Sequence, residues 1–315
     1  MAKIEMWQLK HRQSLDLNTK ILLSTRRIRD WYQENNGKVY VAFSGGKDST
    51  VLLHLIRRIF PNVPAVFIDT GLEYPEIKAF VKTISNVTVV KPKLSFKQVI
   101  DKYGYPVVSK KVARQITTLN NPTAKNAATR NLYLTGIKRD GTTTTSFKLS
   151  KKWHKLIDAP FKTSDKCCYY MKKAPMHKYC KESGNKAFIG TMASDSRARL
   201  ASYLQTGCNN AKEGVSLPLS FWLEKDIWAY IKEYDVPYCS IYDTGVARTG
   251  CVYCMFGAHL EKRPNRFELM QVTHPQLYDY CINKLELGKI LDYVGVEYGN
   301  QKKLVEITPC KKVVV

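Results

Sequence analysis

The sequence has 315 residues, of which 44% are hydrophobic, so the chain can bury a sizeable core in one large domain or two smaller ones. No apolar run approaches the roughly 20 residues of a membrane span, and Met1-Ala-Lys-Ile-Glu-Met lacks the apolar core of a signal peptide, which predicts a cytoplasmic protein without membrane contact. A net charge of +23, from 50 Lys and Arg against 27 Asp and Glu, favours a polyanionic partner such as nucleic acid over an ordinary basic surface.

Predicted strands and helices alternate over the first third of the chain. Apolar residues recur at helical spacing from 17 to 34, before the turn Asn35-Asn36-Gly37. Short apolar, β-branched runs then predict strands at residues 39–43, 65–68 and 87–90, and the segments between them predict helices at 50–60 and 74–84. Short links between such elements indicate an α/β fold with a doubly wound, Rossmann-like parallel sheet.

The alternating pattern weakens near residue 105. Residues 109–166 contain 13 Lys and Arg against 3 Asp and Glu, a net charge of +10, and are predicted to form a basic inserted arm that is partly mobile. A strand is expected at 187–190, a helix at 224–234, and mostly helix from residue 261 onward. We therefore expect an N-terminal helical extension (1–37), a nucleotide-binding domain (38–256) that carries the arm, and a helical C-terminal region with a tail (257–315).

A glycine-rich turn, Ser44-Gly45-Gly46-Lys47-Asp48-Ser49, follows the first predicted strand. Its glycines allow backbone N–H groups to approach a ligand, and the next helix directs its positive N-terminal end to the same place. Lys47 adds a positive charge, and Ser44 and Ser49 add hydroxyl donors, so the turn suits a phosphate better than it suits a ligand-free connection. It is not a Walker A loop, because Val41 stands where that motif requires glycine.

This turn resembles the SGGxDS pyrophosphate loop of the PP-loop ATP pyrophosphatases, which cleave ATP between the α and β phosphates and leave an adenylylated substrate. Ile68-Asp69-Thr70-Gly71-Leu72-Glu73-Tyr74-Pro75-Glu76 resembles the second-strand motif of the phosphoadenylylsulfate (PAPS) reductase branch. Asp69 follows Gly46 at a spacing where an acidic group can reach a ribose or a metal ion; a helix N-cap is its alternative role.

A later stretch, residues 190–199, is similar to the G-x-R-x-x-E-S-x-x-R segment of the same family. The resemblance covers about residues 38 to 256 apart from most of the arm, and it implies a nucleotide site. The implied nucleotide-binding residues are Ser44, Gly45, Gly46, Lys47, Asp48, Ser49, Asp69, Thr70, Gly71, Gly190 and Arg197, with Lys47, Asp48 and Asp69 in the chemistry.

Nine cysteines, an odd number without a secretion signal, are expected to bind metal or do chemistry rather than form disulfides. The two candidate pairs, Cys167-Cys168 and Cys251-x-x-Cys254, are far apart along the chain. Cys-x-x-Cys lets two thiolates bind one centre from a single turn. Adjacent cysteines rarely serve one mononuclear zinc because their side chains diverge, whereas a larger cluster can take both.

The segment Lys166 to Met176 resembles the CC-x-x-R-K-x-x-P-L segment of adenylylsulfate reductases, although Met171 stands where that pattern has arginine. The resemblance implies a 4Fe-4S cluster on Cys167, Cys168, Cys251 and Cys254; zinc and simple buried thiols are the alternatives. The other cysteines, at positions 180, 208, 239, 281 and 310, are interpreted as core or surface thiols.

Two enzymatic hypotheses remain open. A sulfonucleotide reductase, which would take PAPS and a thioredoxin-like reductant, needs a nucleophilic cysteine. The family's Glu-Cys-Gly-Leu-His segment is missing from this sequence; Cys310, beside two lysines, is a candidate substitute but does not match that motif. An ATP-dependent adenylating enzyme would use the complete loop with Mg²⁺ and prepare a substrate for sulfur from a donor.

The basic arm favours nucleic acid as that substrate, since Lys and Arg neutralise phosphates of any sequence. Trp153, Tyr133 and Phe147 lie among these charges and could stack on bases. A solvated basic loop is the alternative for the arm, and a nucleotide-sensing binding protein is a third, non-enzymatic hypothesis. The complete loop and the missing cysteine segment together favour the adenylating enzyme.

Overall fold

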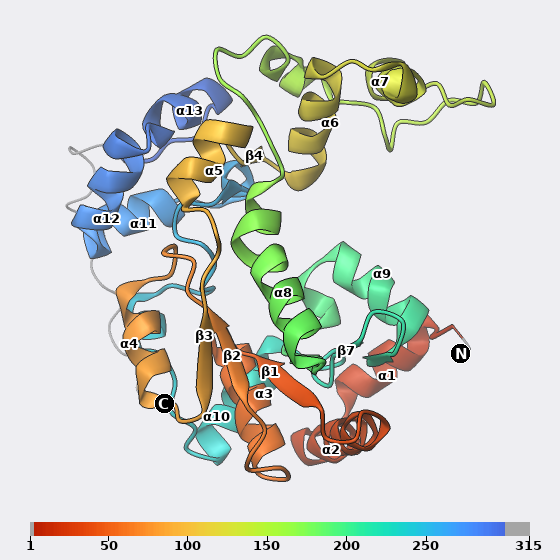
Figure 1. The fold of residues 1–315 in the computed structure, drawn as a ribbon, viewed down its shortest axis with the longest axis vertical. Helices are drawn as coiled ribbons and strands as arrows, with labels where there is room; N and C mark the ends of the chain where they lie inside the picture. Colours follow the sequence, from red (N-terminus) through yellow and green to blue (C-terminus); the bar gives the residue numbers. More distant parts are fainter. Residues whose placement is uncertain (1–2, 300–315) are drawn as a thin grey trace. The chain divides into compact units, whose positions relative to one another are not determined.

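A computed structural model describes residues 3–299, which form two compact units (Figure 1). The first unit contains the chain up to Asp69, residues 73–91 and residues 175–249. The second contains residues 70–72, 92–174 and 250–299. Contacts thus group the residues differently from the boundaries expected at 37 and 256, which stay predictions.

The first unit is built on a six-stranded sheet in the order β3-β2-β1-β5-β7-β6. The strands are β1 (Val39–Ala42), β2 (Ala65–Ile68), β3 (Val87–Val90), β5 (Lys186–Ile189), β6 (Asn209–Asn210) and β7 (Val215–Ser216). All neighbouring pairs are parallel except β6 and β7. Because β1 leads to β2 and β3 on one side while β5 pairs with it on the other, the strand order reverses beside β1. The predicted parallel α/β sheet is confirmed.

Helices cover both faces of this sheet. One face buries Tyr40, Val66 and Ala187 against Met176 and Tyr179 of α8 (Ala174–Ser183), which crosses in front of the strands in Figure 1. On the other side α3 (Lys47–Arg57) packs on β1 and contacts α2 (Leu17–Glu34) and α10 (Glu224–Glu233). The unit also contains α1 (Met6–Ser14), α4 (Pro75–Thr83) and α9 (Arg197–Thr206).

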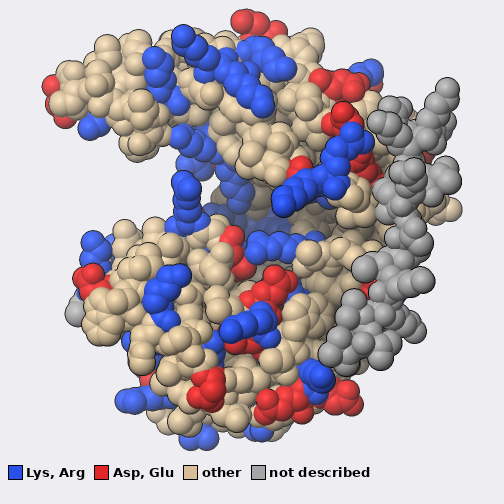
Figure 2. Space-filling view, turned by 180° about the vertical axis from the view of Figure 1, so that it is seen from behind, with Lys and Arg blue, Asp and Glu red and all other residues tan. Residues whose placement is uncertain are grey.

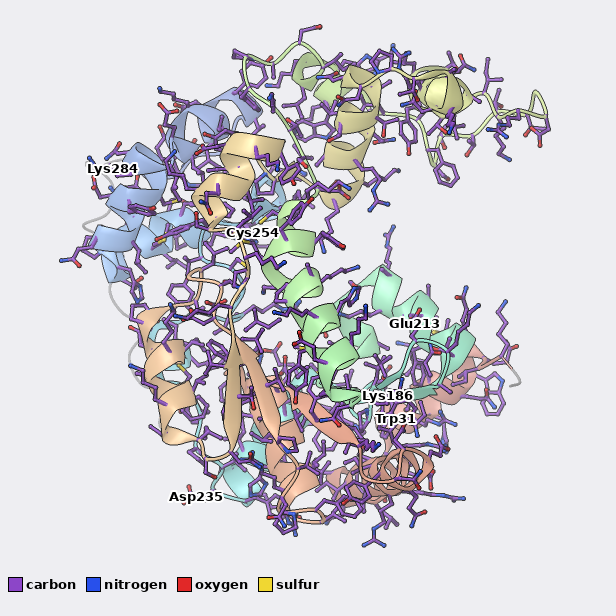
Figure 3. The ribbon with its side chains drawn as sticks, in the orientation of Figure 1. Trp31, Lys186, Glu213, Asp235, Cys254 and Lys284 are labelled. Atoms are coloured by element: carbon purple, nitrogen blue, oxygen red, sulfur yellow. The ribbon has the colours of Figure 1, made fainter. Side chains whose placement is uncertain are left out.

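The helix predicted at 17–34 is α2, and it is held by buried groups. Its Trp31, labelled in Figure 3, is only 2% exposed. Lys20 is fully buried, and its Nζ lies 2.7 Å from Asp226 Oδ2 of α10. Breaking such a buried pair leaves an uncompensated charge, so this contact fixes how α2 meets α10.

The second unit is mostly helical and has one short parallel pair of strands, β4 (Val107–Val108) and β8 (Met255–Phe256). Its helices are α5 (Phe96–Tyr103), α6 (Lys110–Asn120), α7 (Ala127–Thr135), α11 (Arg266–Thr273), α12 (Pro275–Asp279) and α13 (Leu287–Val294), with π-helices at Tyr169–Lys173 and Tyr280–Lys284. The helical C-terminal region is confirmed as far as residue 299. Within residues 3–299, no helix combines the length and apolar character needed to cross a bilayer.

The basic arm contains α6 and α7, which its charge pattern did not predict. Ala113, Ile116 and Leu119 of α6 are buried, while its lysines and Arg114 are exposed. Figure 2 shows Lys and Arg side chains gathered over the arm, at the upper left of that view. The arm therefore contains helices with a buried apolar face and a charged exterior, and its partial mobility stays a prediction.

Candidate functional site

The glycine-rich turn, residues 44–49, joins the carboxyl end of β1 to α3, where the strand order reverses. Gly45 has a φ of +72°, and a Cβ there would lie 2.9 Å from Ile77 Cγ2, so this position requires glycine. Among the described residues, the N–H groups of Asp48 and Ser49 have no hydrogen-bond partner. The turn thus offers backbone donors and the positive end of α3 to an anion.

The two serines of the turn hold its shape. Ser49 Oγ donates to the carbonyl of Gly46 at 2.9 Å and accepts from the N–H of Ser44 at 3.2 Å. The Ser44 and Ser49 hydroxyls lie 3.1 Å apart. Both hydroxyls therefore brace the backbone that would surround a phosphate.

Lys47 is buried at the first position of α3, with its side chain 4% exposed. Its Nζ lies 3.1 Å from Glu224 Oε1 and 3.6 Å from Asp48 Oδ1. The same ammonium is 5.3 Å from the ring centre of Tyr242 and 5.9 Å from that of Trp228. Burial opposes the charge, but Asp48 and Glu224 outweigh it, so the pKa of Lys47 is raised and the side chain stays cationic.

Asp48 carries a buried carboxylate oxygen without a hydrogen bond. Its Oδ1 has no hydrogen-bond partner among the described residues, and its one close cation is Lys47. Burial raises the pKa of Asp48, Lys47 lowers it, and the nearby charges of Asp195 and Glu224 raise it further. A buried oxygen in this condition is costly unless it gains a cation or a donor.

Replacement of Asp48 by asparagine is expected to increase the free energy of unfolding at neutral pH by about 1 kcal/mol or less. Because the pKa of Asp48 is raised in the folded chain, its stabilising contribution is complete below the ordinary value of 3.8 and is lost as the pH rises through the folded value. The asparagine variant has no carboxyl group at this position, so it does not lose stability in this way as the pH rises. Urea unfolding across acid and neutral pH measures the difference, and the exposed Asp235→Asn is the control; equal pH profiles for wild type and Asp48→Asn would contradict the expectation.

The glycine-rich turn at residues 44–49 is called the phosphate turn below, after the ligand predicted for it. It is covered by residues 240–249, the covering segment, which begins with the 3₁₀ helix Ser240–Thr244. The N–H of Lys47 donates to Tyr242 Oη at 2.9 Å, and this hydroxyl lies 3.1 Å from Thr249 Oγ1. A Cβ at Gly46 would lie 2.7 Å from Thr249 Oγ1, so the hydroxyls of Thr249 and Tyr242 are in close contact with the turn and leave no room for a side chain at Gly46. The Tyr242 oxygen thus accepts the hydrogen bond that the N–H of Lys47 could otherwise donate to an anion.

Replacement of Tyr242 by phenylalanine is expected to strengthen binding of inorganic pyrophosphate about tenfold. Without the hydroxyl, the buried N–H of Lys47 has no acceptor in the free protein, which costs about 1–3 kcal/mol, and the anion restores that bond. Isothermal titration with pyrophosphate measures the change. Tyr238→Phe, which removes a hydroxyl bonded to Asp243 instead, is the matched control. Weaker binding to Tyr242→Phe would show that Tyr242 holds the anion rather than competing with it.

The end of β5 lies against the start of α3. A Cβ at Gly190 would lie 2.8 Å from the carbonyl oxygen of Asp48, so glycine permits this approach. Beyond it, Asp195 is 7% exposed, pairs with Arg199 and lies 3.3 Å from Arg248 Nη2. Arg197 begins α9, is exposed and makes no ion pair within residues 3–299. The structure therefore brings Gly190 to the turn, whereas no contact of Arg197 with the turn is seen.

Asp69 follows β2, and its Oδ1 lies 2.8 Å from Lys78 Nζ of α4. It is not the N-cap of α4, because that position belongs to Tyr74. Thr70 is buried and its hydroxyl accepts from the N–H of Leu72, while a Cβ at Gly71 would meet open space. Thr70 and Gly71 belong to the second unit, and their roles at a nucleotide stay predictions.

Sequence reasoning missed several residues around the turn. These are Tyr242, Thr249, Glu224, Trp228, Asp195 and Arg248. They lie far beyond the turn along the chain, so only the packing of α10 and the covering segment places them there. A signal for one of them is the motif at residues 190–199, which contains Asp195.

The four predicted cysteines meet in the second unit. Cys167, Cys168, Cys251 and Cys254 line one cavity of about 20 Å³ together with apolar side chains such as Phe96, Met171 and Phe256. Cys254 closes a tight turn, donating its N–H to the carbonyl of Cys251 at 3.0 Å, and is labelled in Figure 3. Arg266 Nη1 donates to the carbonyl of Cys254 at 2.9 Å.

The chemistry of this cysteine quartet suits a cluster of soft metal ions. Burial, and then the neighbouring thiols of Cys251 and Cys168, raise the pKa of Cys167. Thiol groups that are buried and crowded in this way gain from a shared cation that takes their thiolates. As they stand, no three Cys, His, Asp or Glu groups in the described part of the chain are arranged to hold a single metal ion. Four cysteine thiols are the donor set that a 4Fe-4S cluster needs, but they are not arranged around a single ion in this structure.

A parallel sheet with a glycine-rich strand-to-helix turn at its switch point defines an α/β nucleotide-binding protein of the PP-loop class. Residues 38–145 and 123–256 match the family model of the phosphoadenosine phosphosulfate reductase domain. The chain therefore belongs to the PAPS reductase family, as the sequence motifs predicted.

Known relatives are distant. An adenosine 5'-phosphosulfate reductase of Lysinibacillus sphaericus is 25% identical over 228 residues, which cover 72% of this chain and 77% of the relative. An uncharacterised protein of Methanocaldococcus jannaschii is 24% identical over 294 residues, covering 90% of this chain but 56% of its own length. The crystal structure of a PAPS reductase from Candida auris is 19% identical and has a TM-score of 0.43, covering 79% of this chain and 97% of that one.

Proposed function

We propose that this protein is an enzyme that cleaves ATP to AMP and pyrophosphate and adenylylates a nucleic-acid substrate for sulfur transfer. The observation that carries the proposal is the complete phosphate turn, in which the cation of Lys47 is buried and the nearby Oδ1 of Asp48 is buried without a hydrogen bond. A triphosphate with its counter-ion supplies both an anion for Lys47 and a cation for Asp48. A turn that served only as a connection would need neither group.

In this reaction a substrate oxygen attacks the α-phosphorus, a new O–P bond forms, and the α–β bridging bond breaks. The electron pair leaves with pyrophosphate. The N–H groups at the start of α3 and the Lys47 ammonium bind the β and γ phosphates and stabilise the charge on the leaving group. Asp48 fits a Mg²⁺ ion, which would offset phosphate charge when bound. Asp69, held by Lys78, is proposed to orient the ribose.

The nucleic-acid substrate is supported by the basic arm and by the net charge of +23. Trp153, one of the three aromatic residues expected to stack on bases, is 6% exposed and packs edge-on to His259. Phe147 is 51% exposed and remains free to contact a ligand. We further propose that the cysteine quartet holds a 4Fe-4S cluster and takes part in the sulfur transfer from a donor.

A PAPS or adenylylsulfate reductase is the second candidate function, favoured by the named relatives. In that case Cys310 would be the nucleophile and a thioredoxin-like protein the reductant. Cys310 lies outside the described residues, so its surroundings give no support.

One assay separates the two functions. Anaerobically purified protein is incubated with Mg²⁺ and ATP labelled in the α-phosphate, with and without bulk tRNA or DNA. We expect nucleic acid to increase the release of pyrophosphate, with the labelled AMP group first on the nucleic acid and then free as AMP once water or a sulfur donor displaces it. Sulfite from PAPS in the presence of thioredoxin, without cleavage of ATP, would instead establish the reductase.

A further inference from the structure

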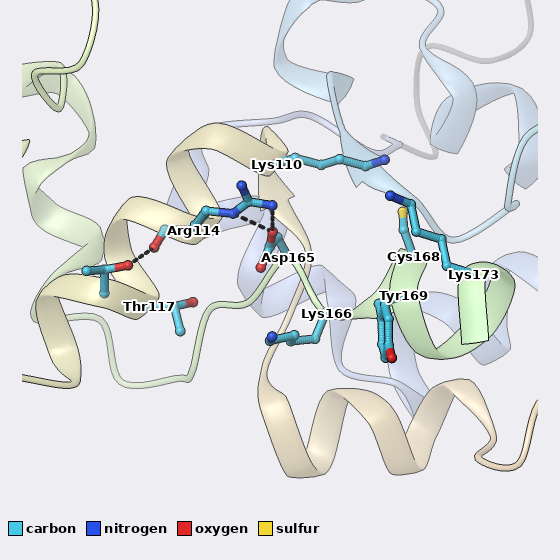
Figure 4. A pocket seen from close by; sticks show the side chains of 9 residues that line it. Lys110, Arg114, Thr117, Asp165, Lys166, Cys168, Tyr169 and Lys173 are labelled. Atoms are coloured by element: carbon cyan, nitrogen blue, oxygen red, sulfur yellow. Dashed lines mark hydrogen bonds and ion pairs between the residues drawn. The ribbon is translucent and has the colours of Figure 1, made fainter. Parts of the chain in front are cut away.

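A second cavity lies in the second unit, between α6 and the π-helix Tyr169–Lys173 (Figure 4). Its volume is about 380 Å³, within the usual range for a small-molecule site. It is distinct from the phosphate turn, which belongs to the first unit. We call it the basic pocket, because four of the nine residues that line it are lysine or arginine.

The charge of the basic pocket is uncompensated. Arg114 is neutralised, since its Nε and Nη2 lie 3.0 Å and 2.8 Å from Asp165 Oδ2, as Figure 4 shows. Within residues 3–299, no carboxylate lies within ion-pair distance of Lys110, Lys166 or Lys173, which also line the pocket. Three unpaired ammonium groups around one cavity call for a ligand with more than one negative charge.

The basic pocket also presents an aromatic surface. The side chain of Tyr169 is 46% exposed and lines the cavity. Its ring meets Tyr170 edge-on, with centres 5.2 Å apart, and Tyr170 stacks on Tyr103 at 4.6 Å. These contacts hold the Tyr169 ring in place while much of it remains open to solvent. An exposed, braced ring beside phosphate-binding cations is the arrangement that receives an unpaired base.

Cys168 lines both the basic pocket and the cavity of the cysteine quartet. We propose that the basic pocket binds one unpaired nucleotide of a nucleic-acid strand, with its phosphates on Lys110, Lys166 and Lys173 and its base on Tyr169. The nucleotide then lies beside the cysteine quartet. This inference rests on the proposed function, which makes nucleic acid the substrate, and adds where and in what form the strand is held.

Nucleic acid explains more of the pocket than other anions do. A free phosphate or sulfate would satisfy the lysines but would leave the Tyr169 ring without a role. Lys110, Arg114 and Lys166 of the lining belong to the arm, residues 109–166, whose net charge is +10, so the same segment carries further cations for the phosphates of a longer strand. An unpaired nucleotide is required, because a base within a duplex cannot place its face on a protein ring.

The test measures binding of a fluorescent single-stranded oligonucleotide of about 12 nucleotides to the full chain, as a function of salt. Tyr169→Ala is expected to weaken binding about tenfold or more, because a stacked base is lost. Lys110→Ala with Lys166→Ala is expected to reduce the slope of log K against log salt by about 1.4, since each phosphate contact on a single strand contributes about 0.7. Circular dichroism verifies that both variants fold.

Lys125→Ala with Lys138→Ala is the matched control, because it removes the same charge from exposed positions of the arm outside the pocket. Full binding by this control and weak binding by the pocket variants support the inference. Equal losses in control and pocket variants would overturn the pocket while leaving nucleic acid as the substrate. If wild type binds no oligonucleotide, both the pocket and the nucleic-acid substrate fall, whereas cleavage of ATP without nucleic acid tests the nucleotide chemistry independently.

Discussion

Replacement of Lys47 by methionine is expected to reduce the rate of ATP cleavage by about 10²–10³-fold, the usual cost of removing one group that stabilises transition-state charge. Methionine keeps the length and most of the volume of the lysine side chain, so it can still fill the space beside the rings of Trp228 and Tyr242. What disappears is the positive charge that faces the leaving pyrophosphate. The rate of pyrophosphate release at saturating ATP measures the effect.

The matched control for this variant is Lys225→Met on α10, an exposed lysine in the same unit. Loss of Lys47 also leaves Asp48 and Glu224 without their cation, so thermal unfolding of both variants must be compared. An unchanged rate in a folded Lys47→Met protein would show that the turn binds no pyrophosphate during the reaction. A large rise in KM with normal turnover would place Lys47 in substrate binding alone.

Four strands of the first unit, β1, β2, β3 and β5, could be predicted because each is a short, mostly apolar run bounded by turn residues. The expected strands at 65–68 and 87–90 match β2 and β3 residue for residue. Helix α3 begins before the expected start at residue 50, because Gly46 is its N-cap and its first three residues are the polar Lys47, Asp48 and Ser49, of which Lys47 and Ser49 are buried. A helix that begins with polar residues lacks the apolar spacing in its first turn, so a rule based on hydrophobic periodicity places its start too late.

The second unit was harder to predict, for two physical reasons. Strands β4 and β8 have two residues each, which is too short to show an alternating pattern. In α6, apolar residues do recur three positions apart at Ala113, Ile116 and Leu119, but the charges between them suggested an arm without a core. Glu224 and Tyr242 could not be linked to the turn, since no local pattern encodes contacts between positions so distant along the chain.

For the cysteine quartet, residue types predicted which side chains meet but not what they bind. Two pairs of cysteines from distant parts of the sequence were expected to meet, and the structure places all four on one cavity. Their spacing could not specify whether they hold iron and sulfide, one zinc or nothing. The identity of the metal depends on where the four sulfur atoms lie once an ion is bound, so it has to be measured.

Anaerobically purified protein is expected to be brown and to contain the iron and sulfide of a 4Fe-4S cluster, and Cys254→Ser is expected to lose most of both. The serine hydroxyl is a much poorer ligand for iron than a thiolate, and the turn that holds Cys251 and Cys254 has no other donor in reach among the residues that line the cavity. Iron and sulfide content and the visible absorption spectrum are the measurements, so the result does not depend on activity.

Cys281→Ala is the matched control for Cys254→Ser. Cys281 lies in the same unit, is fully buried and is not part of the quartet, so its replacement tests whether loss of any core thiol releases the metal. Retention of the brown colour in Cys281→Ala and its loss in a folded Cys254→Ser assign the cluster to the quartet. A colourless wild-type protein with one zinc ion would replace the cluster by a mononuclear site, and wild-type protein without any metal would leave the four cysteines as a group of buried thiols.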